Sequence, residues 1–178
     1  MYKRILFISL FSALLFGFKA DVGAPPAVEE YVKFQIKNAG INIDGFFAEF
    51  TSLVSYDPSS PNSATFSGEI KVSSINTGIE MRDEHLVGEE YFDATNHPNI
   101  TFKSTRVAKL TNGNLKVAGT LSVKETSKEV ELIVEPTISG DKTYFKAKLE
   151  LDRLDYEVGE NSWVLSDDVF CEIMVAVN

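Results

Sequence analysis

Arg82, Asp83 and His85 lie close together and are the residues of this sequence best suited to chemistry. An arginine can hold a phosphate or a carbonyl oxygen through its planar fork of N–H groups, and a histidine can exchange protons near neutral pH. The same side chains could instead tether a helix to the rest of the fold, through hydrogen bonds to backbone groups or to a carboxylate such as Asp155. The sequence leaves both roles open.

Two other kinds of chemistry lack their usual residue patterns. Hydrolysis by a serine needs a base and an orienting acid, yet the sequence has no Gly-x-Ser-x-Gly turn. The only cysteine, Cys171, lies in the apolar phase of an alternating stretch, where a thiol behaves as a small hydrophobic group. The one plausible metal set combines His85 and His97 with Asp83 and Asp93, but histidines twelve residues apart match no usual ligand spacing. We therefore expect no catalytic residues, no metal, no cofactor and no enzymatic activity.

The composition favours one acidic domain. The chain has 178 residues, of which 44% are apolar and 24% charged, values that argue against a disordered tail and a polytopic membrane protein. Its 26 acidic residues exceed its 17 basic residues, so the formal net charge is −9. Because nucleic-acid binding needs a basic surface that displaces counterions from phosphates, we expect no nucleic-acid partner. One cysteine cannot form an internal disulfide, so packing alone must hold the fold.

Residues 1–20 predict a secretory signal peptide. Lys3 and Arg4 precede fourteen uncharged residues, 5–18, and small residues follow near the expected cleavage positions, 20–24. The apolar run is short for a membrane span, which takes about 20 residues; a retained anchor is the alternative. Residues 21–30 would form a tether and residues 31–178 the domain. Loss of Lys3, Arg4 and Lys19 takes the charge from −9 to −12. Such a periplasmic or secreted protein would be repelled by anionic lipid and would not insert stably into a membrane.

Apolar and polar residues alternate with a period of two through most of residues 31–178, a pattern typical of strands with one buried face. Turn residues such as Gly113 and Gly140 separate neighbouring strands and make them antiparallel. Closure pairs every edge, so we predict an all-β fold, an eight-stranded antiparallel barrel. Phe46, Phe47 and Phe50 crowd one strand, where a β-bulge could turn two of them inward. The eight strands are expected at residues 32–37, 46–56, 64–75, 100–110, 115–124, 130–138, 145–152 and 169–177.

One connection breaks the alternation and predicts a short helix around residues 77–88. Thr77 and Glu80 have the spacing of a capping box, in which two side chains satisfy free backbone N–H groups at a helix start. Helical spacing would place Ile79 and Leu86 on one face. We expect this helix to cover one end of the barrel with that face turned inward.

An eight-stranded barrel is just wide enough inside to be filled by side chains or to hold one small ligand. Its inward positions include the small residues Gly68, Gly119 and Ala147, which could interlock with large neighbours or leave a void. A void would be lined by aliphatic and aromatic groups and would select a long apolar ligand. The candidate lining residues are Phe34, Phe66, Ile70, Val72, Phe102, Leu121, Phe145 and Leu149.

Motifs around the expected helix resemble the signature of the YceI-like family. They are Ser74-Ile75-Asn76-Thr77-Gly78, Arg82-Asp83-Glu84-His85-Leu86, Tyr91-Phe92-Asp93 and the run over residues 97–105. The similarity covers about residues 31–177 and includes Asp152-Arg153-Leu154-Asp155-Tyr156 and Ser166-Asp167-Asp168-Val169. The chain departs from the family pattern at Asn38, Ser122, Glu125 and Glu157, the last of which stands where a glycine is usual.

The resemblance implies an exported, lipocalin-like β-barrel that binds a polyisoprenoid chain in an elongated apolar pocket. The ligand would be a quinone or a prenyl phosphate, with its tail in the lumen and its head group at the mouth, beside Arg82, Asp83, His85 and Phe92. We expect this protein to sequester or transport the isoprenoid lipid, which is the partner that the resemblance implies. Two alternatives stay open: a small outer-membrane barrel whose apolar face points outward to lipid, and a solid-cored barrel that acts as a stress or interaction protein.

Overall fold

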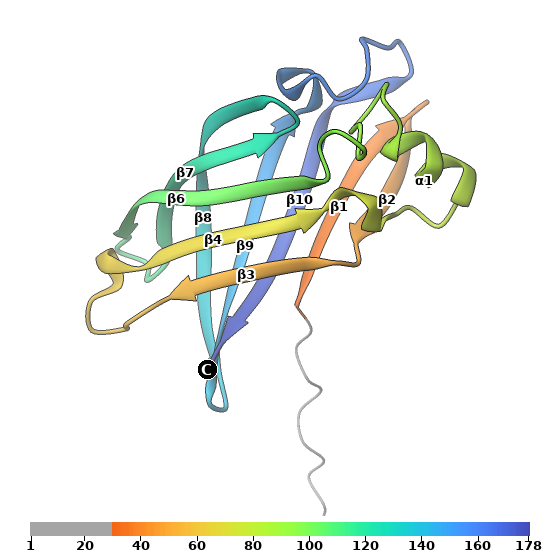
Figure 1. Ribbon diagram of the computed structural model, residues 1–178. Coiled ribbons are helices and arrows are strands. Elements are labelled where there is room, and N and C mark those ends of the chain that lie inside the picture. The colour runs from red at the N-terminus through yellow and green to blue at the C-terminus, as the bar shows by residue number, and fades with distance from the viewer. Residues whose placement is uncertain (1–29) are drawn as a thin grey trace, which may run out of the picture.

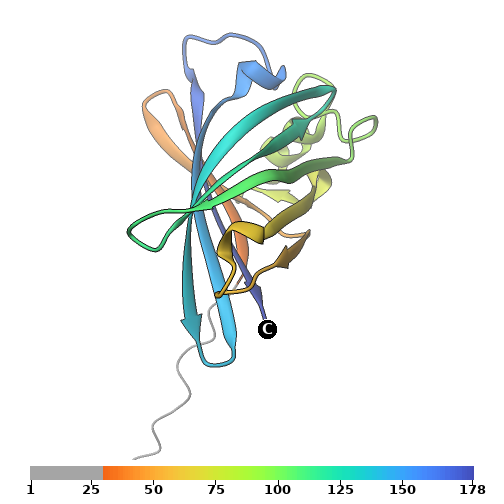
Figure 2. The ribbon, with the colours of Figure 1, turned by 90° about the vertical axis from the view of Figure 1, so that its left-hand side faces the viewer.

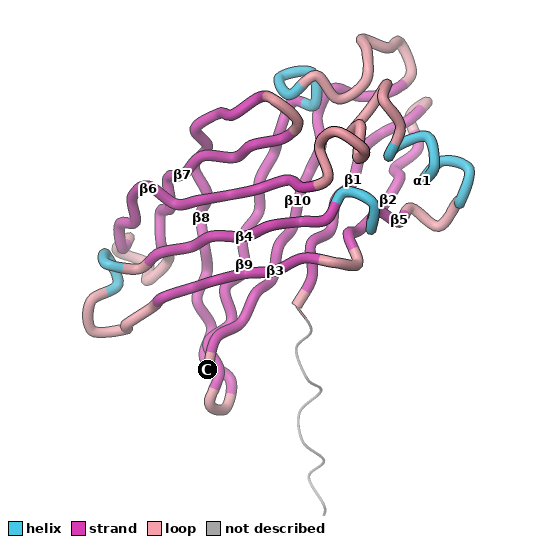
Figure 3. The backbone as a smooth tube through the Cα atoms, in the orientation of Figure 1, coloured by secondary structure: helices cyan, strands magenta, loops and turns pink. Residues whose placement is uncertain are grey.

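Ten strands, one α-helix and three short 3-10 helices make up residues 30–178, the part of the chain that the computed structural model describes (Figures 1 and 3). The predicted signal peptide, residues 1–20, and residues 21–29 of the predicted tether lie outside this part. The strands are β1 (Tyr31–Asn38), β2 (Ile41–Phe47), β3 (Phe50–Ser55), β4 (Thr65–Lys71), β5 (Ile75–Asn76), β6 (Asn99–Lys109), β7 (Leu115–Val123), β8 (Thr126–Ser139), β9 (Lys142–Asp152) and β10 (Leu165–Val177). The helices are α1 (Glu80–Val87) and the 3-10 turns η1 (Pro61–Ser63), η2 (Val72–Ser74) and η3 (Arg153–Tyr156).

All ten strands belong to one antiparallel sheet with the order β3-β4-β6-β7-β8-β9-β10-β1-β2-β5. Short turns join β6 to β9 in succession, and a longer connection with η3 leads to β10. In Figure 1, β3, β4, β6 and β7 cross in front of β8, β9, β10 and β1, and Figure 2 shows the strong curl of the sheet from the side. The predicted all-β, antiparallel, barrel-like fold is confirmed, but the expected pairing of every edge is not observed, because β3 and β5 end the strand order and do not pair with each other.

The predicted count of eight strands is wrong, because two of the predicted strands each bend and break in two. The predicted strand 46–56 is interrupted at Ala48 and Glu49, between β2 and β3, and the predicted strand 64–75 is interrupted by η2, between β4 and β5. The two bends face each other: the Ala48 N–H donates to the Ser74 carbonyl at 3.0 Å, and the Lys71 N–H donates to the Glu49 carbonyl at 3.0 Å. Since β2 pairs with β1 while β3 pairs with β4, this corner carries the chain between the two layers.

The crowded phenylalanines lie at this same corner. Phe47 is buried and Phe50 packs against the core, whereas Phe46 is 41% exposed. Two of the three side chains therefore point inward, and the inward phase shifts by one residue at the bend, from odd positions in β2 to even positions in β3.

The interior contains two clusters of buried side chains. One cluster surrounds Phe145, which is 1% exposed, and the rings of Tyr56 and Phe66 pack edge-on against it with centroids 5.0 and 5.3 Å away. Leu115 and Val117 complete this tightly filled end, which we call the packed end. The second cluster lies toward α1 and, in contrast, surrounds an open space.

Charged residues cover the outer face of the sheet. Along β7 every second side chain from Leu115 to Val123 is buried, while Lys116 points outward and pairs with Glu131 of β8 at 2.6 Å. An apolar interior with a charged exterior is the reverse of what an outer-membrane barrel needs, since the outer face of such a barrel contacts lipid.

Helix α1 begins at Glu80, later than the capping-box pattern predicts. Its N-cap is Ile79, whose side chain cannot cap, so the predicted box between Thr77 and Glu80 does not form. Asp83 acts instead: its carboxylate accepts the Thr77 N–H at 2.9 Å and the Thr77 hydroxyl at 2.5 Å, which fixes the approach to the helix. Within residues 30–178, no helix combines the length and the hydropathy that a membrane span requires.

Candidate functional site

A cavity of about 500 Å³ lies inside the curled sheet, on the side where α1 covers it. Aliphatic and aromatic side chains from both layers and from the helix form most of its wall, including Phe34, Phe47, Leu86, Leu151 and Ile173. Ligand sites in proteins usually have volumes of about 300–1,000 Å³ and apolar walls with few polar groups. The cavity therefore has the size and the lining to bury an apolar molecule.

The charged residues of the cavity wall are all cationic. They are Lys33, Arg82 and Arg153, together with His85 when it is protonated, and no Asp or Glu lines the cavity in the part of the chain described. This distribution contrasts with the net charge of −9 for the whole chain. An anionic group in the cavity would meet no like charge on the wall, so the wall favours an anion over a cation.

Arg82 lies at the cavity on α1 and is held by a neutral partner. Its Nε donates to the Thr77 hydroxyl oxygen at 2.7 Å, and its Nη2 donates to the Thr77 carbonyl at 2.8 Å. No ion pair joins Arg82 to a carboxylate within residues 30–178. The alternative hydrogen bond from Arg82 to Asp155 is not formed. The Asp155 carboxylate pairs with Lys128 instead. Arg82 thus orients the helix start through Thr77 while its charge stays unpaired.

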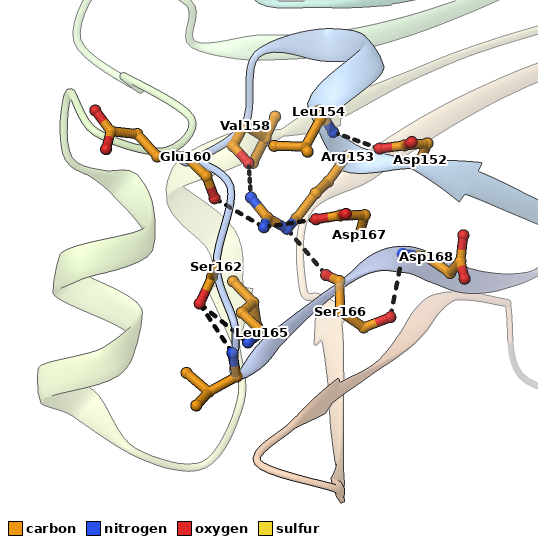
Figure 4. Close-up of polar contacts among 11 residues, drawn as sticks. Asp152, Arg153, Leu154, Val158, Glu160, Ser162, Leu165, Ser166, Asp167 and Asp168 are labelled. Carbon is orange, nitrogen blue, oxygen red and sulfur yellow. Dashed lines mark hydrogen bonds and ion pairs between the residues drawn. The ribbon is translucent and has the colours of Figure 1, made fainter.

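Arg153 donates four hydrogen bonds in a buried polar cluster (Figure 4). The side chain is 4% exposed. Its Nε donates to the Ser166 carbonyl at 2.9 Å, its Nη1 to the Val158 carbonyl at 2.9 Å, and its Nη2 to the Glu160 carbonyl at 2.8 Å and to the Asp167 carboxylate at 2.9 Å. One buried guanidinium therefore holds both sides of the connection between β9 and β10.

Sequence reasoning assigned no role to Arg153, although a signal was present. Residues 145, 147, 149 and 151 alternate inward on β9, and position 153 continues that phase with a charged residue. A charge at an inward position indicates a buried, paired group, because an unpaired one would be too costly.

The connection held by Arg153 also packs against the segment after α1. Gly159 donates its N–H to the Glu90 carbonyl at 3.1 Å. Its φ is +70°, and a Cβ built there would lie 2.8 Å from the ring of Tyr91, so glycine is needed for both reasons. Nearby Glu157 adopts a φ of 57° at the position where the family usually has glycine, so its left-handed backbone explains that preference. These contacts join the two segments that border the cavity.

Cys171 lines the cavity on β10. Burial raises the pKa of its thiol to about 11, so the group stays protonated at neutral pH. The thiol therefore contributes an apolar surface, as its place in the alternating pattern predicted.

Comparison with known proteins identifies this architecture. Residues 26–177, most of the chain, match the YceI-like domain. The chain belongs to the YceI-like family. A UPF0312 protein of Pectobacterium atrosepticum is 27% identical over 93% of this chain and 87% of its own.

Solved structures of other proteins share the YceI-like fold. BcnA of Burkholderia cenocepacia superposes with a TM-score of 0.80 at 24% identity, covering 84% of this chain and 96% of its own. A domain from Saccharophagus degradans, described as polyisoprenoid-binding, superposes with a TM-score of 0.64 at 16% identity, covering 83% and 92% of the two chains. At these identities the likeness establishes the fold, which agrees with the lipocalin-like barrel that the resemblance implied.

The predicted lining residues of this YceI-like protein fall into three groups. Phe34, Ile70, Leu121 and Leu149 line the cavity. Phe66, Phe102 and Phe145 line a smaller pocket of about 130 Å³, which we call the inner pocket and which also contacts Ile70, Leu121 and Leu149. Val72 is 1% exposed and lines neither space, because its side chain is packed within the core.

The residues predicted at the mouth of the YceI-like barrel are brought together only in part. Arg82, His85 and Phe92 line the cavity, and the ring of Phe92 packs edge-on against Phe47 with centroids 6.3 Å apart. Asp83 does not line it: this residue borders a separate surface pocket, and its carboxylate accepts two hydrogen bonds from Thr77. Ile79 and Leu86 line the cavity as well, and Ile79 is 52% exposed at its edge.

The histidines and acids considered as a metal set do not converge. His97 lies 4.0 Å from Asp93, while His85 faces the ring of Tyr91. Over residues 30–178, no three His, Cys, Asp or Glu side chains come close enough to hold a metal ion.

Proposed function

We propose that this protein binds one polyisoprenoid lipid, a quinone or a prenyl phosphate, with its tail in the cavity and its head group near Arg82. The observation that carries the proposal is the apolar cavity of about 500 Å³, which opens beside an unpaired arginine. The fold shared with a domain described as polyisoprenoid-binding supports the choice of ligand class. The unpaired charge of Arg82 at the cavity favours a prenyl phosphate over an uncharged quinone.

The energetics of tail burial suit this proposal. Taking a liquid volume of about 30 Å³ for each carbon group, similar to a water molecule, the cavity holds about 17 tail carbons. Burying them at about 0.8 kcal/mol each stabilises the complex by roughly 14 kcal/mol before costs. Losses of translational, rotational and tail freedom offset about 4–15 kcal/mol of this. At the lower end of that range about 10 kcal/mol remains, which suffices for binding without a covalent bond, a metal or a catalytic group.

The biological role that we propose is to sequester or carry the lipid through an aqueous compartment. The predicted signal peptide would export the chain to the periplasm or beyond, and the acidic outer face would keep it in solution there. The charged exterior and the apolar interior are the two properties that a carrier of an insoluble chain needs. The role is binding, without enzymatic turnover.

Lipid extraction tests the proposal directly. The protein is purified without detergent from cells that export it, extracted with organic solvent, and analysed in parallel by native mass spectrometry. We expect one isoprenoid lipid per chain. The variant Leu151→Trp places a large side chain in the cavity and should lose the lipid. The control Leu53→Trp changes a residue of β3 that is 76% exposed and should retain the lipid. A lipid-free wild-type protein that also fails to take up both added prenyl phosphate and added prenyl quinone would refute the proposal and favour a solid-cored interaction protein.

A further inference from the structure

Exposed apolar side chains gather at the end of the barrel where the cavity opens. Within residues 30–178 ten large apolar side chains are exposed, and five of them belong to the β1–β2 hairpin, the start of α1 and the connection before β10. These three segments lie together at the upper right of Figure 1. We call the five residues the apolar rim: Ile41, Ile79, Met81, Trp163 and Val164. Ile79 and Met81 also line the cavity, whereas the other three lie outside its wall.

The strand register places the rim at the mouth of the cavity. Asn38 pairs with Leu165 of β10 on one side and with Ile41 of β2 on the other. Both Asn38 and Leu165 line the cavity. Ile41 continues the inward phase of Ile43, which lines the cavity one step further in. Ile41 is therefore the next inward position beyond the cavity wall, at its open end.

The connection that carries Trp163 is fixed to the same hairpin. The Val164 carbonyl accepts the Ala39 N–H at 2.7 Å, and the Ser162 hydroxyl accepts the Val164 N–H at 3.2 Å. Trp163 lies between these two anchored residues and is fully exposed. The rim is thus a set of exposed side chains on segments that hydrogen bonds hold in place beside the mouth.

Neither the core nor the cavity explains why Ile41 and Trp163 are apolar. Both are exposed and lie outside the cavity wall, so polar side chains would serve the fold equally well. Single exposed apolar residues are common on proteins, but a cluster of them marks an interaction site. Tryptophan in particular is enriched where proteins meet the surface of a bilayer, because its ring is apolar and its N–H is polar.

We propose that the apolar rim docks this protein transiently onto the surface of a lipid bilayer, so that a lipid passes between membrane and cavity without crossing water. The inference rests on the proposed function, because a bilayer is the source of an isoprenoid lipid. Every carbon of such a chain resists transfer into water. A cavity mouth that touches the bilayer removes this barrier, and the rim surrounds that mouth.

The charge of the chain determines which bilayers fit. The net charge is −9, and the rim is flanked by the exposed Glu80, Glu84 and Glu160. Anionic head groups would be repelled, so the contact must rest on apolar insertion among zwitterionic head groups. Five side chains bury far less apolar surface than a membrane span, so the contact is shallow and reversible.

The fluorescence of Trp163 and vesicle flotation test the docking. Trp163 is the only tryptophan of the chain, so its emission reports on the rim alone. Lipid-free, full-length mature protein is mixed with phosphatidylcholine vesicles. We expect the protein to float with the vesicles, the emission to shift to shorter wavelength, and lipids brominated on their acyl chains to quench it. Adding phosphatidylglycerol to the vesicles should weaken the binding.

Two isoleucines form a matched pair of variants. Ile41 is 67% exposed and Ile138 is 71% exposed. Their cross-strand rows reach Leu165 and Val177, the two ends of β10, roughly 40 Å apart at about 3.4 Å per residue. Ile41→Ser should weaken vesicle binding about tenfold, because an apolar side chain no longer enters the bilayer. Ile138→Ser removes the same side chain at the packed end and should leave vesicle binding unchanged.

The outcomes separate the docking from the proposed function. Titration with soluble farnesyl phosphate, without vesicles, should give the wild-type affinity for both variants, since neither residue lines the cavity. The docking is wrong if the wild type binds farnesyl phosphate but no vesicle, or if the two variants lose vesicle binding equally. It is also overturned if the wild type forms a dimer that Ile41→Ser dissociates, with no vesicle binding, since the rim would then join two copies. Failure to bind both farnesyl phosphate and a short prenyl quinone would instead refute the proposed function.

Discussion

Replacing Arg153 by methionine should destabilise the folded protein by about 4 kcal/mol. Methionine keeps part of the apolar stem but removes every donor of the guanidinium. The Val158 carbonyl, which accepts its bond in a buried setting, is left without a donor at a cost of about 1–3 kcal/mol. The Ser166 and Glu160 carbonyls lie in partly buried settings and can bind water instead, so each loses about 1 kcal/mol. At about 2–4 °C per kcal/mol, the melting temperature should fall by about 8–16 °C.

Urea unfolding of three proteins tests this reasoning. The wild type, Arg153→Met and Asp167→Asn are compared at one protein concentration and lipid content. Asparagine at 167 keeps an acceptor for Nη2, and the Asp167 side chain is 41% exposed, so this variant should cost less than about 1 kcal/mol. The contribution assigned to the three carbonyls is refuted if Arg153→Met stays within 1 kcal/mol of the wild type, or if Asp167→Asn costs as much as Arg153→Met.

Three further predictions follow from the cavity and the packed end. In titration calorimetry, Arg82→Ala should weaken binding of a prenyl phosphate about tenfold or more, and binding of the matching uncharged prenol less than about threefold. The control is Arg106→Ala, at an exposed position. Equal losses for both ligands would exclude a head-group role for Arg82. The alkylation rate of Cys171 at pH 8, measured by mass spectrometry, should be about a hundredfold lower than that of an exposed thiol, because burial raises the pKa of the thiol to about 11. The rate should increase about tenfold per pH unit up to pH 10. A rate independent of pH would contradict this. Phe145→Ala should cost about 3–5 kcal/mol in urea unfolding, whereas Phe170→Ala, at a position 49% exposed, should cost far less; similar values would show that the packed end is not where stability lies.

The alternating pattern predicted most of the strands but could not predict where they bend. On β7 the alternation from Leu115 to Val123 matches the observed burial residue by residue. The inward positions change from odd numbers in β2 to even numbers in β3 across Ala48 and Glu49, a shift that predicts a bulge but not a turn of the chain into the other layer. A corner depends on contacts between two distant strands, here Ala48 with Ser74, and such contacts are absent from a local pattern.

The cavity itself was the harder prediction, because inward position does not determine whether a side chain fills space or borders it. Val72 and Leu149 were both assigned to the lumen, yet the first is packed and only the second faces a void. Phe34 lies so close over Gly45 that a Cβ there would be 2.3 Å from its ring, a contact between neighbouring strands that no alternating pattern reveals. The predicted capping box is also wrong. Thr77 and Glu80 have the spacing of a capping box, but Thr77 donates both its N–H and its hydroxyl to the Asp83 carboxylate.

The division of the interior into a packed end and a hollow end runs across the strands rather than between them. Strand β7 begins among the 0%-exposed side chains of Leu115 and Val117 and finishes at the cavity with Leu121 and Val123. Its backbone amides should therefore exchange with solvent at graded rates, slow at the first residues and faster at the last, since local opening follows local packing. One continuous strand thus belongs to the packed end at its start and to the cavity wall at its finish. Local opening of the cavity wall would let a lipid enter or leave while the packed end stays folded.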